Sequence, residues 1–366
     1  MIKNWILTLL MAGSSWAVAS GQDNARYTDA RQFQIVGKGL PTSPVYQRLD
    51  STQDRALTPA VKNLSKHSSG IAVLFETNST YISAKWNLRR GLYHANIPPI
   101  CHSGLDLYAW NNGKWQWVGV GRPGDKDTAN TNTLISNMDG QMRQYMLYLP
   151  TYNEITSLQI GVAPEAELRR SASPKIDTTH RMVIYGSSIL QGASASRAGM
   201  SYSSILQRRT GWDVVNLGFS GNGKMEFPVA ELLAEMPASL FVLDCIPNPT
   251  VEEVKERAYP FIKHLLDKRP EVPVLLVETV KRENGYFDQK IGQVTVDKNK
   301  AIREAYTKLK SEGYKQLYYL SADNLIGQDH EATIDGVHLT DLGFMRQVEA
   351  MMPQLRKLMK KSQAIR

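Results

Sequence analysis

The chain has 366 residues, 42% hydrophobic and 21% charged, which is the size of about two domains and the composition of a globular protein. The formal net charge is +8, but the basic residues are scattered and none of their groups alternates with aromatics, which argues against nucleic-acid binding. Cys101 and Cys245 are too few for a disulfide scaffold or a zinc site, so we expect each to be buried singly or the two to pair in an oxidising compartment.

The N-terminus has the pattern of a secretory signal. Lys3 supplies a positive charge, the apolar segment WILTLLMAG follows it, and AVA at residues 17–19 offers the small residues that a signal peptidase requires. We therefore expect residues 1–19 to be a signal peptide and the mature protein to be exported, to the periplasm or out of the cell. The apolar segment is too short for a membrane span, and no later segment reaches the roughly 18 apolar residues that a span needs, so no integral membrane segment is expected.

The first half of the chain alternates apolar and polar residues, which is typical of half-buried β-strands. Segments 71–77 and 81–88 each place every second residue on one apolar face. The intervening letters TNST suit a tight turn, so we expect these two segments to form a hairpin.

A second hairpin is expected in residues 105–120. Asn112 and Gly113 at its centre are the residue types that accept the positive φ angles of a two-residue turn. Segments 143–150 and 156–163 add two short strands. Many short strands with frequent turns predict an antiparallel β-sandwich domain for residues 20–170, including a leading segment.

The pattern of apolar and polar residues changes after residue 170. Residues 171–180 are polar and without pattern, and we interpret them as a linker. In residues 181–366, continuously apolar runs alternate with amphipathic segments, which predicts an α/β domain with a parallel sheet of about five strands between layers of helices. The expected strands begin near residues 182, 213, 240, 272 and 316, and the expected helices are 201–209, 228–236, 251–268, 295–313 and 340–361.

In such a sheet, ligands bind beyond the carboxyl ends of the strands. The first expected strand ends in Gly186, Ser187 and Ser188. Gly186 allows a sharp turn, which puts Ser188 at or near the start of the next helix or turn. A serine there either caps a helix or acts as a nucleophile, and a nucleophile needs a base within hydrogen-bond reach and donors for the oxyanion.

The next two strand ends offer candidate donors. The second strand leads into NLGFSGNG, where Gly218, Gly221 and Gly223 keep the loop thin enough for a backbone N–H to approach a ligand, although most such loops are only turns. This loop lacks the spacing of a nucleotide-phosphate site. The third strand is followed by Asn248 between two prolines, which is either a turn residue or a neutral oxyanion donor.

Asp335 and His338 lie three residues apart, just before the last expected helix. At this spacing the carboxylate can orient the imidazole and stabilise the imidazolium that forms when the histidine takes a proton from a serine. None of the other six histidines has a comparable pairing beside a strand end. Each of these signals is weak by itself. All of them occurring in this order by chance is much less expected than any one of them alone.

These residues resemble the SGNH (GDSL-type) hydrolase family. YGSSILQG looks like its first block, with Ser188 in the nucleophile position and a serine where aspartate is usual. NLGFSGNG is similar to the second block, with Gly221 in the place of the oxyanion glycine. DCIPNPT is similar to the third block at Asn248 but lacks the usual Gly-x-Asn-Asp, and DGVH fits the fifth block at Asp335 and His338.

SGLDLYAW, residues 103–110, resembles the GxDLY motif of a β-sandwich that precedes SGNH domains in some secreted bacterial proteins. Together the resemblances imply a jelly-roll-like sandwich, a flavodoxin-like sheet and a secreted serine esterase, most often one acting on acylated, for example acetylated, carbohydrates. They imply no metal or organic cofactor. The implied catalytic residues are Ser188, Asp335 and His338, and the implied oxyanion hole is the Ser188 N–H, the Gly221 N–H (with Gly218 as substitute) and the Asn248 side chain.

Two alternatives stay open. Lipid esters, thioesters or aryl esters are other substrates for the same site, and a carbohydrate-binding protein is a different function, because aromatic residues of the first half could stack on sugar rings. Arg197, Asp106 and His102 are candidate substrate contacts, or else structural residues of their loops. The expected partner is a small-molecule or glycan ester, and the sequence leaves the oligomeric state unknown.

Overall fold

A computed structural model describes residues 24–40, 44–50, 56–91 and 94–364 of the protein. The predicted signal peptide, residues 1–19, lies outside the described residues, so its removal and the export of the protein stay predictions. Within the described ranges, no helix combines the length and the apolar character that crossing a membrane requires.

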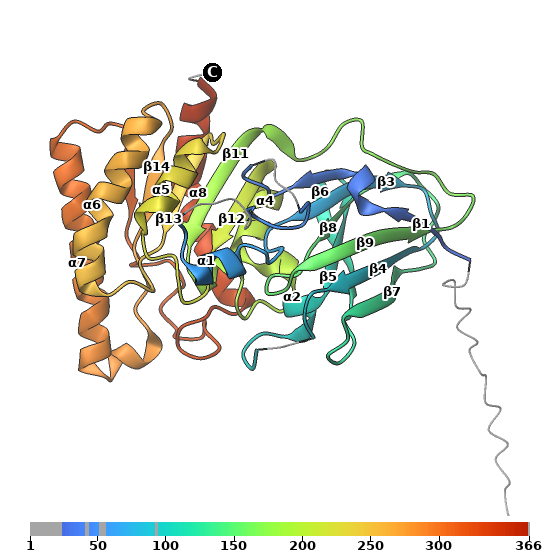
Figure 1. Ribbon diagram of the computed structural model, residues 1–366, viewed down its shortest axis with the longest axis horizontal. Helices are drawn as coiled ribbons and strands as arrows, with labels where there is room; N and C mark the ends of the chain where they lie inside the picture. Colours follow the sequence, from blue (N-terminus) through green and yellow to red (C-terminus); the bar gives the residue numbers. More distant parts are fainter. Residues whose placement is uncertain (1–23, 41–43, 51–55, 92–93, 365–366) are drawn as a thin grey trace, which may run out of the picture.

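A β-sandwich and a helix-covered parallel sheet lie side by side in Figure 1. One sheet of the sandwich has the strand order β1-β9-β4-β7, and the other has β10-β3-β8-β5-β6 with β2 also paired to β3. All their pairs are antiparallel, so the predicted antiparallel sandwich is confirmed. The elements of this half are β1 (Arg26–Asp29), η1 (Ala30–Gln32), β2 (Gln34–Val36), α1 (Pro59–Leu64), β3 (Ala72–Thr77), β4 (Ile82–Leu88), α2 (Pro99–Ser103), β5 (Leu105–Asn111), β6 (Lys114–Gly121), β7 (Ala129–Ile135), β8 (Arg143–Tyr148), β9 (Ile155–Val162) and β10 (Leu168–Arg169).

The predicted hairpin of segments 71–77 and 81–88 is wrong. β3 pairs with β2, β8 and β10, whereas β4 pairs with β7 and β9 in the other sheet. Phe75 of β3 and Trp86 of β4 nevertheless share one buried cluster between the sheets. The alternation identified the buried faces correctly, but it cannot identify hydrogen-bond partners, because strands of two packed sheets bury alternate residues in the same core.

The predicted hairpin in residues 105–120 is confirmed. β5 and β6 pair in antiparallel register, and Asn112 and Gly113 between them have φ angles of 48° and 76°, as a two-residue turn of mirror-image type requires. β8 and β9 correspond to the two further strands. No pattern in the sequence indicated β1, β2, β7 or β10, and β7 has the sequence ANTNTLI, which is rich in residues typical of turns.

The parallel sheet has the strand order β12-β11-β13-β14-β15, which is the predicted flavodoxin-like arrangement. The predicted strands and helices are present, and the helix expected at 295–313 begins six residues earlier. In this order the first strand, β11, lies between β12 and β13. The elements are β11 (Asp177–Gly186), α3 (Ser188–Gln191), η2 (Ala198–Met200), α4 (Tyr202–Thr210), β12 (Trp212–Gly218), α5 (Phe227–Glu235), β13 (Leu240–Asp244), α6 (Val251–Lys268), β14 (Val274–Val277), η3 (Glu283–Tyr286), α7 (Gln289–Ser311), β15 (Leu317–Leu320) and α8 (Asp341–Ala364).

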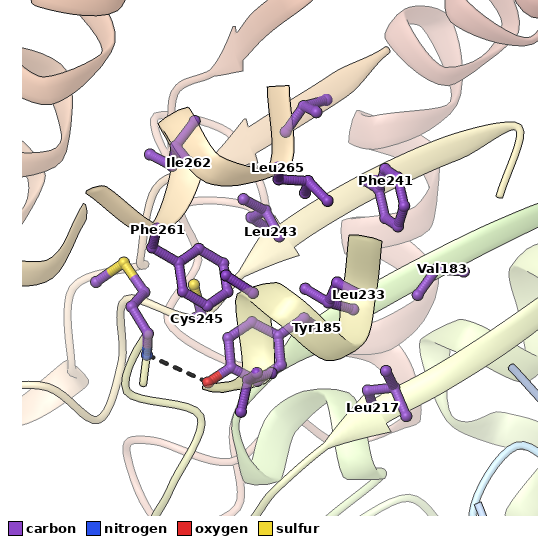
Figure 2. Packing of buried hydrophobic residues seen from close by; sticks show 14 of the residues in the cluster. Val183, Tyr185, Leu217, Leu233, Phe241, Leu243, Cys245, Phe261, Ile262 and Leu265 are labelled. Atoms are coloured by element: carbon purple, nitrogen blue, oxygen red, sulfur yellow. Dashed lines mark hydrogen bonds between the residues drawn. The ribbon is translucent and has the colours of Figure 1, made fainter. Parts of the chain in front are cut away.

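Strand β11 is buried on both faces. Val183 and Tyr185 belong to the cluster with α5, α6 and α7, whereas Met182 and Ile184 belong to the cluster with α4 and α8. In Figure 2 the Tyr185 ring stacks on Phe261, with ring centroids 5.5 Å apart, and its hydroxyl accepts a backbone N–H hydrogen bond of 3.2 Å. Packing on both faces fixes β11 and therefore fixes the point where it ends.

The leading segment, residues 37–70, does not pack only in the sandwich. Leu49, Leu57 and Val61 belong to the same buried cluster as Leu217 of β12, on a face of the parallel sheet. Figure 1 shows the short helix α1 of this segment next to the parallel sheet. The predicted boundary near residue 170 therefore divides the chain in sequence, but the packing of the two parts crosses it.

Arg48 anchors this segment to the parallel sheet. Its guanidinium has no exposed surface and donates hydrogen bonds to the carbonyl oxygens of Asn216 (3.2 Å), Gly218 (2.5 Å), Leu64 (2.6 Å) and His67 (3.0 Å). Burial lowers the pKa of Arg48 to about 9, so the group is still charged at neutral pH. One side chain thus joins the leading segment to the carboxyl end of β12.

Both cysteines are free and buried. The Cys101 sulfur lies 3.2 Å from the hydroxyl of Thr151, and Cys245 belongs to the cluster of Figure 2. Of the two expectations for the cysteines, single burial is the one that holds.

We predict that Arg48→Met lowers the free energy of unfolding by about 3 kcal/mol or more, because it leaves buried carbonyl groups without donors. Urea unfolding followed by tryptophan fluorescence measures the change. Arg356→Met, a substitution on the exposed side of α8, is the matched control and should change stability by less than about 0.5 kcal/mol. Equal stability of the Arg48 and Arg356 variants would show that the anchor contributes nothing.

Candidate active site

Ser188 stands where the buried strand β11 ends. Ser187 is the N-cap of α3 and accepts a hydrogen bond from the Ile189 N–H at 3.2 Å, and Ser188 is the first residue of that helix. A Cβ at Gly186 would lie 2.5 Å from the carbonyl oxygen of Asp244, so the tight turn requires glycine. The capping role therefore belongs to Ser187, and the hydroxyl of Ser188 is left for another partner.

That partner is His338. Ser188 Oγ lies 2.9 Å from His338 Nε2, and His338 Nδ1 lies 2.8 Å from Asp335 Oδ2. The His338 backbone N–H also donates to Asp335 Oδ1 at 2.8 Å. Because the carboxylate accepts the Nδ1 proton, Nε2 is the nitrogen left to accept the proton of the serine. Ser188, predicted from the end of the first strand, thus forms one hydrogen-bonded chain with His338 and Asp335, which were predicted together from the segment before the last helix.

Asp335 is held in its ionised form. Burial raises its pKa, but hydrogen bonds from the His338 backbone N–H, the His338 ring and the Asn96 amide outweigh burial and lower the pKa of Asp335 to about 2. The carboxylate is therefore charged at neutral pH. A fixed negative charge beside Nδ1 favours an imidazole that has gained a proton on Nε2.

Asn96 is a site residue that the sequence did not reveal. Its Nδ2 lies 3.1 Å from Asp335 Oδ2 and 3.3 Å from His338 Nδ1, and its carbonyl oxygen accepts a 2.7 Å hydrogen bond from Ser194. Asn96 lies just before α2, in the half of the chain that forms the sandwich. It belongs to no motif and is 239 residues from Asp335, so only the fold brings the two together.

The loops after β12 and β13 meet beside Ser188. Asn248 Nδ2 donates to the carbonyl oxygen of Asn222 at 2.6 Å, which joins the third strand end to the glycine loop. Gly221 has a φ of +68° and is exposed, and a Cβ there would touch nothing within 4 Å. Gly218 is different, because a Cβ there would lie 2.2 Å from the Gln191 nitrogen. Close packing on α3 thus accounts for Gly218, and Gly221 is the glycine that borders open space.

Asp106 and Arg197 contact each other rather than a ligand. Asp106 has no exposed surface, and its carboxylate accepts hydrogen bonds from Arg197 Nη1 (2.9 Å), the Gly199 N–H (2.8 Å) and Trp117 Nε1 (2.9 Å). The Arg197 guanidinium also lies over the rings of Tyr108 and Trp117. Asp106 therefore has no face for a substrate, and the pair joins the sandwich to the loop after α3. Of the two alternatives for Asp106 and Arg197, these contacts favour structural residues of their loops.

A small cavity opens next to the Ser188–His338 pair. It has a volume of about 160 Å³, and Ile189 and Val337, the neighbours in sequence of the serine and the histidine, line it. Its other lining residues include the apolar Pro247 and Val280 and the cationic Arg282 and Lys298. We call it the small cavity. Across the described part of the chain, no cluster of three or more histidine, cysteine or carboxylate side chains is arranged to hold a metal ion.

Two family models match the chain. Residues 179–356 match the GDSL-like lipase/acylhydrolase family, and residues 25–168 match the N-terminal domain of SGNH-hydrolase-type esterases. No curated protein matches the chain significantly.

Several solved structures are similar over most of their length. A protein of Bacteroides ovatus described as a GDSL-like lipase is 41% identical, with a TM-score of 0.88 over 92% of this chain and 98% of that one. The salicylyl-acyltransferase SsfX3 of a tetracycline biosynthetic pathway is 15% identical, with a TM-score of 0.74 over 91% of this chain and 97% of its own. A family two carbohydrate esterase of Cellvibrio japonicus is 13% identical, with a TM-score of 0.59 over 92% and 99%. The last two comparisons show a shared fold.

We predict that Asn96→Ala lowers kcat for 4-nitrophenyl acetate by about tenfold and changes KM little. The Asn96 amide touches the carboxylate and the imidazole but not the serine, and one hydrogen bond to a charged group contributes about 1.5–3 kcal/mol. Steady-state kinetics separate the two constants. Asn87→Ala, at an exposed asparagine of β4, is the control. An unchanged kcat in Asn96→Ala would mean that the amide does not help to position Asp335.

Proposed function

The chain belongs to the GDSL-like lipase/acylhydrolase family and is a carboxylic ester hydrolase, and we propose that it cleaves short-acyl esters of carbohydrates through an acyl-enzyme on Ser188. The observation that carries the proposal is the unbroken chain from Ser188 Oγ through the His338 ring to the Asp335 carboxylate. We also propose that export, through the signal predicted at residues 1–19, places the enzyme where it meets glycan esters.

In the first half-reaction, His338 Nε2 takes the proton of Ser188 as Oγ attacks the ester carbonyl carbon. The carbonyl oxygen becomes an oxyanion, for which we propose three donors: the Ser188 N–H, the Gly221 N–H and the Asn248 side chain. The imidazolium then gives its proton to the leaving alcohol as the ester C–O bond breaks. Asp335, ionised throughout, stabilises the imidazolium during this step.

In the second half-reaction, water attacks the acyl group on Ser188. His338 takes a proton from the water and returns it to Ser188 Oγ as the acyl–serine bond breaks, which releases the carboxylic acid. Every proton moves between His338, the serine, the alcohol and water, so the proposed cycle needs no metal or organic cofactor.

The small cavity supports a short acyl group. Its volume of about 160 Å³ is below the roughly 300–1,000 Å³ of common ligand pockets, and Ile189 and Val337, which follow Ser188 and precede His338 in sequence, contribute aliphatic side chains to it. A long acyl chain needs a longer apolar channel. The carbohydrate part of the proposal has support from the fold shared with the esterase of Cellvibrio japonicus and with an acetyl xylan esterase of Butyrivibrio proteoclasticus.

We predict that Ser188→Ala lowers kcat for 4-nitrophenyl acetate by at least about 10⁴-fold, because it removes the group that forms the acyl-enzyme. Asn248→Ala should lower kcat on the order of 10²–10³-fold through the loss of one oxyanion donor. Labelling with a fluorophosphonate should occur in the wild type and disappear in Ser188→Ala. Wild-type activity in Ser188→Ala, with an unchanged unfolding curve, would refute the mechanism.

We predict that kcat/KM falls steadily along a series of 4-nitrophenyl esters from acetate to octanoate, because the small cavity has little room for added methylenes. Acetate release from acetylated mono- and polysaccharides, with Ser188→Ala as the blank, tests the carbohydrate preference. A rate that rises with chain length up to octanoate would favour the alternative of a lipase or thioesterase.

A further inference from the structure

A larger cavity lies at the junction of the sandwich and the parallel sheet. Its volume is about 520 Å³, within the usual range for a bound small molecule. We call it the junction cavity. His94, His102 and Tyr152 line it from the sandwich half of the chain, and Ser220, which directly precedes Gly221, lines it from the loop after β12.

The two cavities receive lining residues from different strand ends of the parallel sheet. The small cavity is bordered by Pro247, which follows β13, and by Thr279 and Val280, which follow β14. The junction cavity is bordered by Ser220, which follows β12. Because β12 and β13 are the neighbours of β11 on its two sides, Ser220 and Pro247 follow strands on opposite sides of the one that leads to Ser188. The small cavity has an aliphatic side, formed by Ile189, Val280 and Val337, that suits the acyl group, and Arg282 and Lys298 lie on its lining as well. This assignment leaves the junction cavity for the alcohol.

The junction cavity offers neutral imidazoles. His67 Nδ1 lies 3.0 Å from the Gln191 amide nitrogen and accepts its proton, which places the His67 proton on Nε2. His102 Nε2 lies 3.0 Å from His94 Nδ1. Burial, and next the charge of Arg48, lower the pKa of His67 to about 3, and burial lowers the pKa of His102 to about 4. Both ring nitrogens of His102 are already bonded, Nδ1 to the Ser103 hydroxyl at 2.7 Å and Nε2 to His94, so the sugar hydroxyls would meet Nε2 of His67 or His94. Neutral imidazoles both donate and accept, which suits such hydroxyl groups.

The junction cavity also carries net positive charge. Lys66, Arg89, Arg90 and Glu154 line it, and Arg89 Nε is paired with Glu154 Oε2 at 3.2 Å. Within the residues that the structure describes, the Lys66 ammonium and the Arg90 guanidinium form no hydrogen bond or ion pair. Two cationic groups are therefore available to a ligand, and carboxylates pair well with such groups.

We propose that the junction cavity binds the alcohol half of the ester and that this alcohol is an acidic sugar, with hydroxyls on the imidazoles and a carboxylate at Lys66 and Arg90. The inference rests on the proposed function, because it assigns the sugar to the ester that Ser188 cleaves. It makes the sandwich part of the substrate site and gives it a role in specificity.

A matched pair of substrates tests the inference. Mono-acetylated galacturonic acid and galactose, acetylated at the same hydroxyl, differ only in the carboxylate. We expect the wild type to show a kcat/KM about tenfold higher for the acidic sugar. Lys66→Gln and Arg90→Gln should each lower the acidic-to-neutral ratio by about three- to fivefold, because each removes one ion pair, and the double variant should bring it close to one. Because both substrates are measured with the same variant, a general loss of activity cancels in the acidic-to-neutral ratio of kcat/KM.

Arg356→Gln removes a charge far along α8 and should leave the ratio at the wild-type value. A wild-type ratio near one would overturn the inference, and so would a high ratio that survives in the double variant, because recognition would then lie elsewhere. Both results leave the proposed function intact if 4-nitrophenyl acetate is hydrolysed by the wild type and not by Ser188→Ala. If that dependence on Ser188 is absent, the proposed function itself fails.

Discussion

The geometry of the active site depends on the buried Asp106 carboxylate. Burying a carboxylate is unfavourable unless donors satisfy it, and here Arg197, the Gly199 N–H and Trp117 do so. Arg197 and Gly199 belong to the segment that follows α3, and α3 is the helix that carries Ser188. The sandwich therefore binds the segment that follows Ser188 through the Asp106 carboxylate. Leaving this buried charge unpaired would be unfavourable. The aspartate of the GxDLY motif has a physical role in joining the two halves.

The same segment is bonded on other sides. Ser194 donates to the Asn96 carbonyl oxygen at 2.7 Å, and the Ser196 backbone N–H and hydroxyl both donate to Asp341, at 2.9 and 2.6 Å. Asp341 begins α8, three residues after His338. The segment after α3 thus connects three parts of the molecule: Ser188, the segment that carries His338, and the sandwich. Movement of the sandwich would disturb Asn96 and Asp335 together, so the first half of the chain is part of the active centre rather than an appended module.

The sequence predicted the catalytic residues on the parallel sheet because topology brings successive strand ends to one edge. Ser188 could be found in this way at the end of the first strand, and Asp335 and His338 through the single motif DGVH that they share; their catalytic roles stay predictions. Asn96 and His67 could not, because they reach the site from a different part of the fold and carry no local pattern. The pairing of β3 with β8 was equally hidden, since alternation reports burial and not the neighbouring strand. Sequence patterns thus identified the candidate catalytic residues, and the packing of the two halves determined which other side chains lie around them.

The neutral histidines of the junction cavity fit the charges around them. A charged imidazole at His67 would be buried near the Arg48 guanidinium, which itself stays protonated because its pKa, about 9, is above neutral. Keeping His67 and His102 neutral therefore avoids repulsion, and it leaves Lys66, Arg90 and the Glu154-paired Arg89 as the basic side chains of the cavity. The positive field of the cavity then varies little from mildly acidic to neutral pH. Over that range the Asp335 carboxylate also stays ionised.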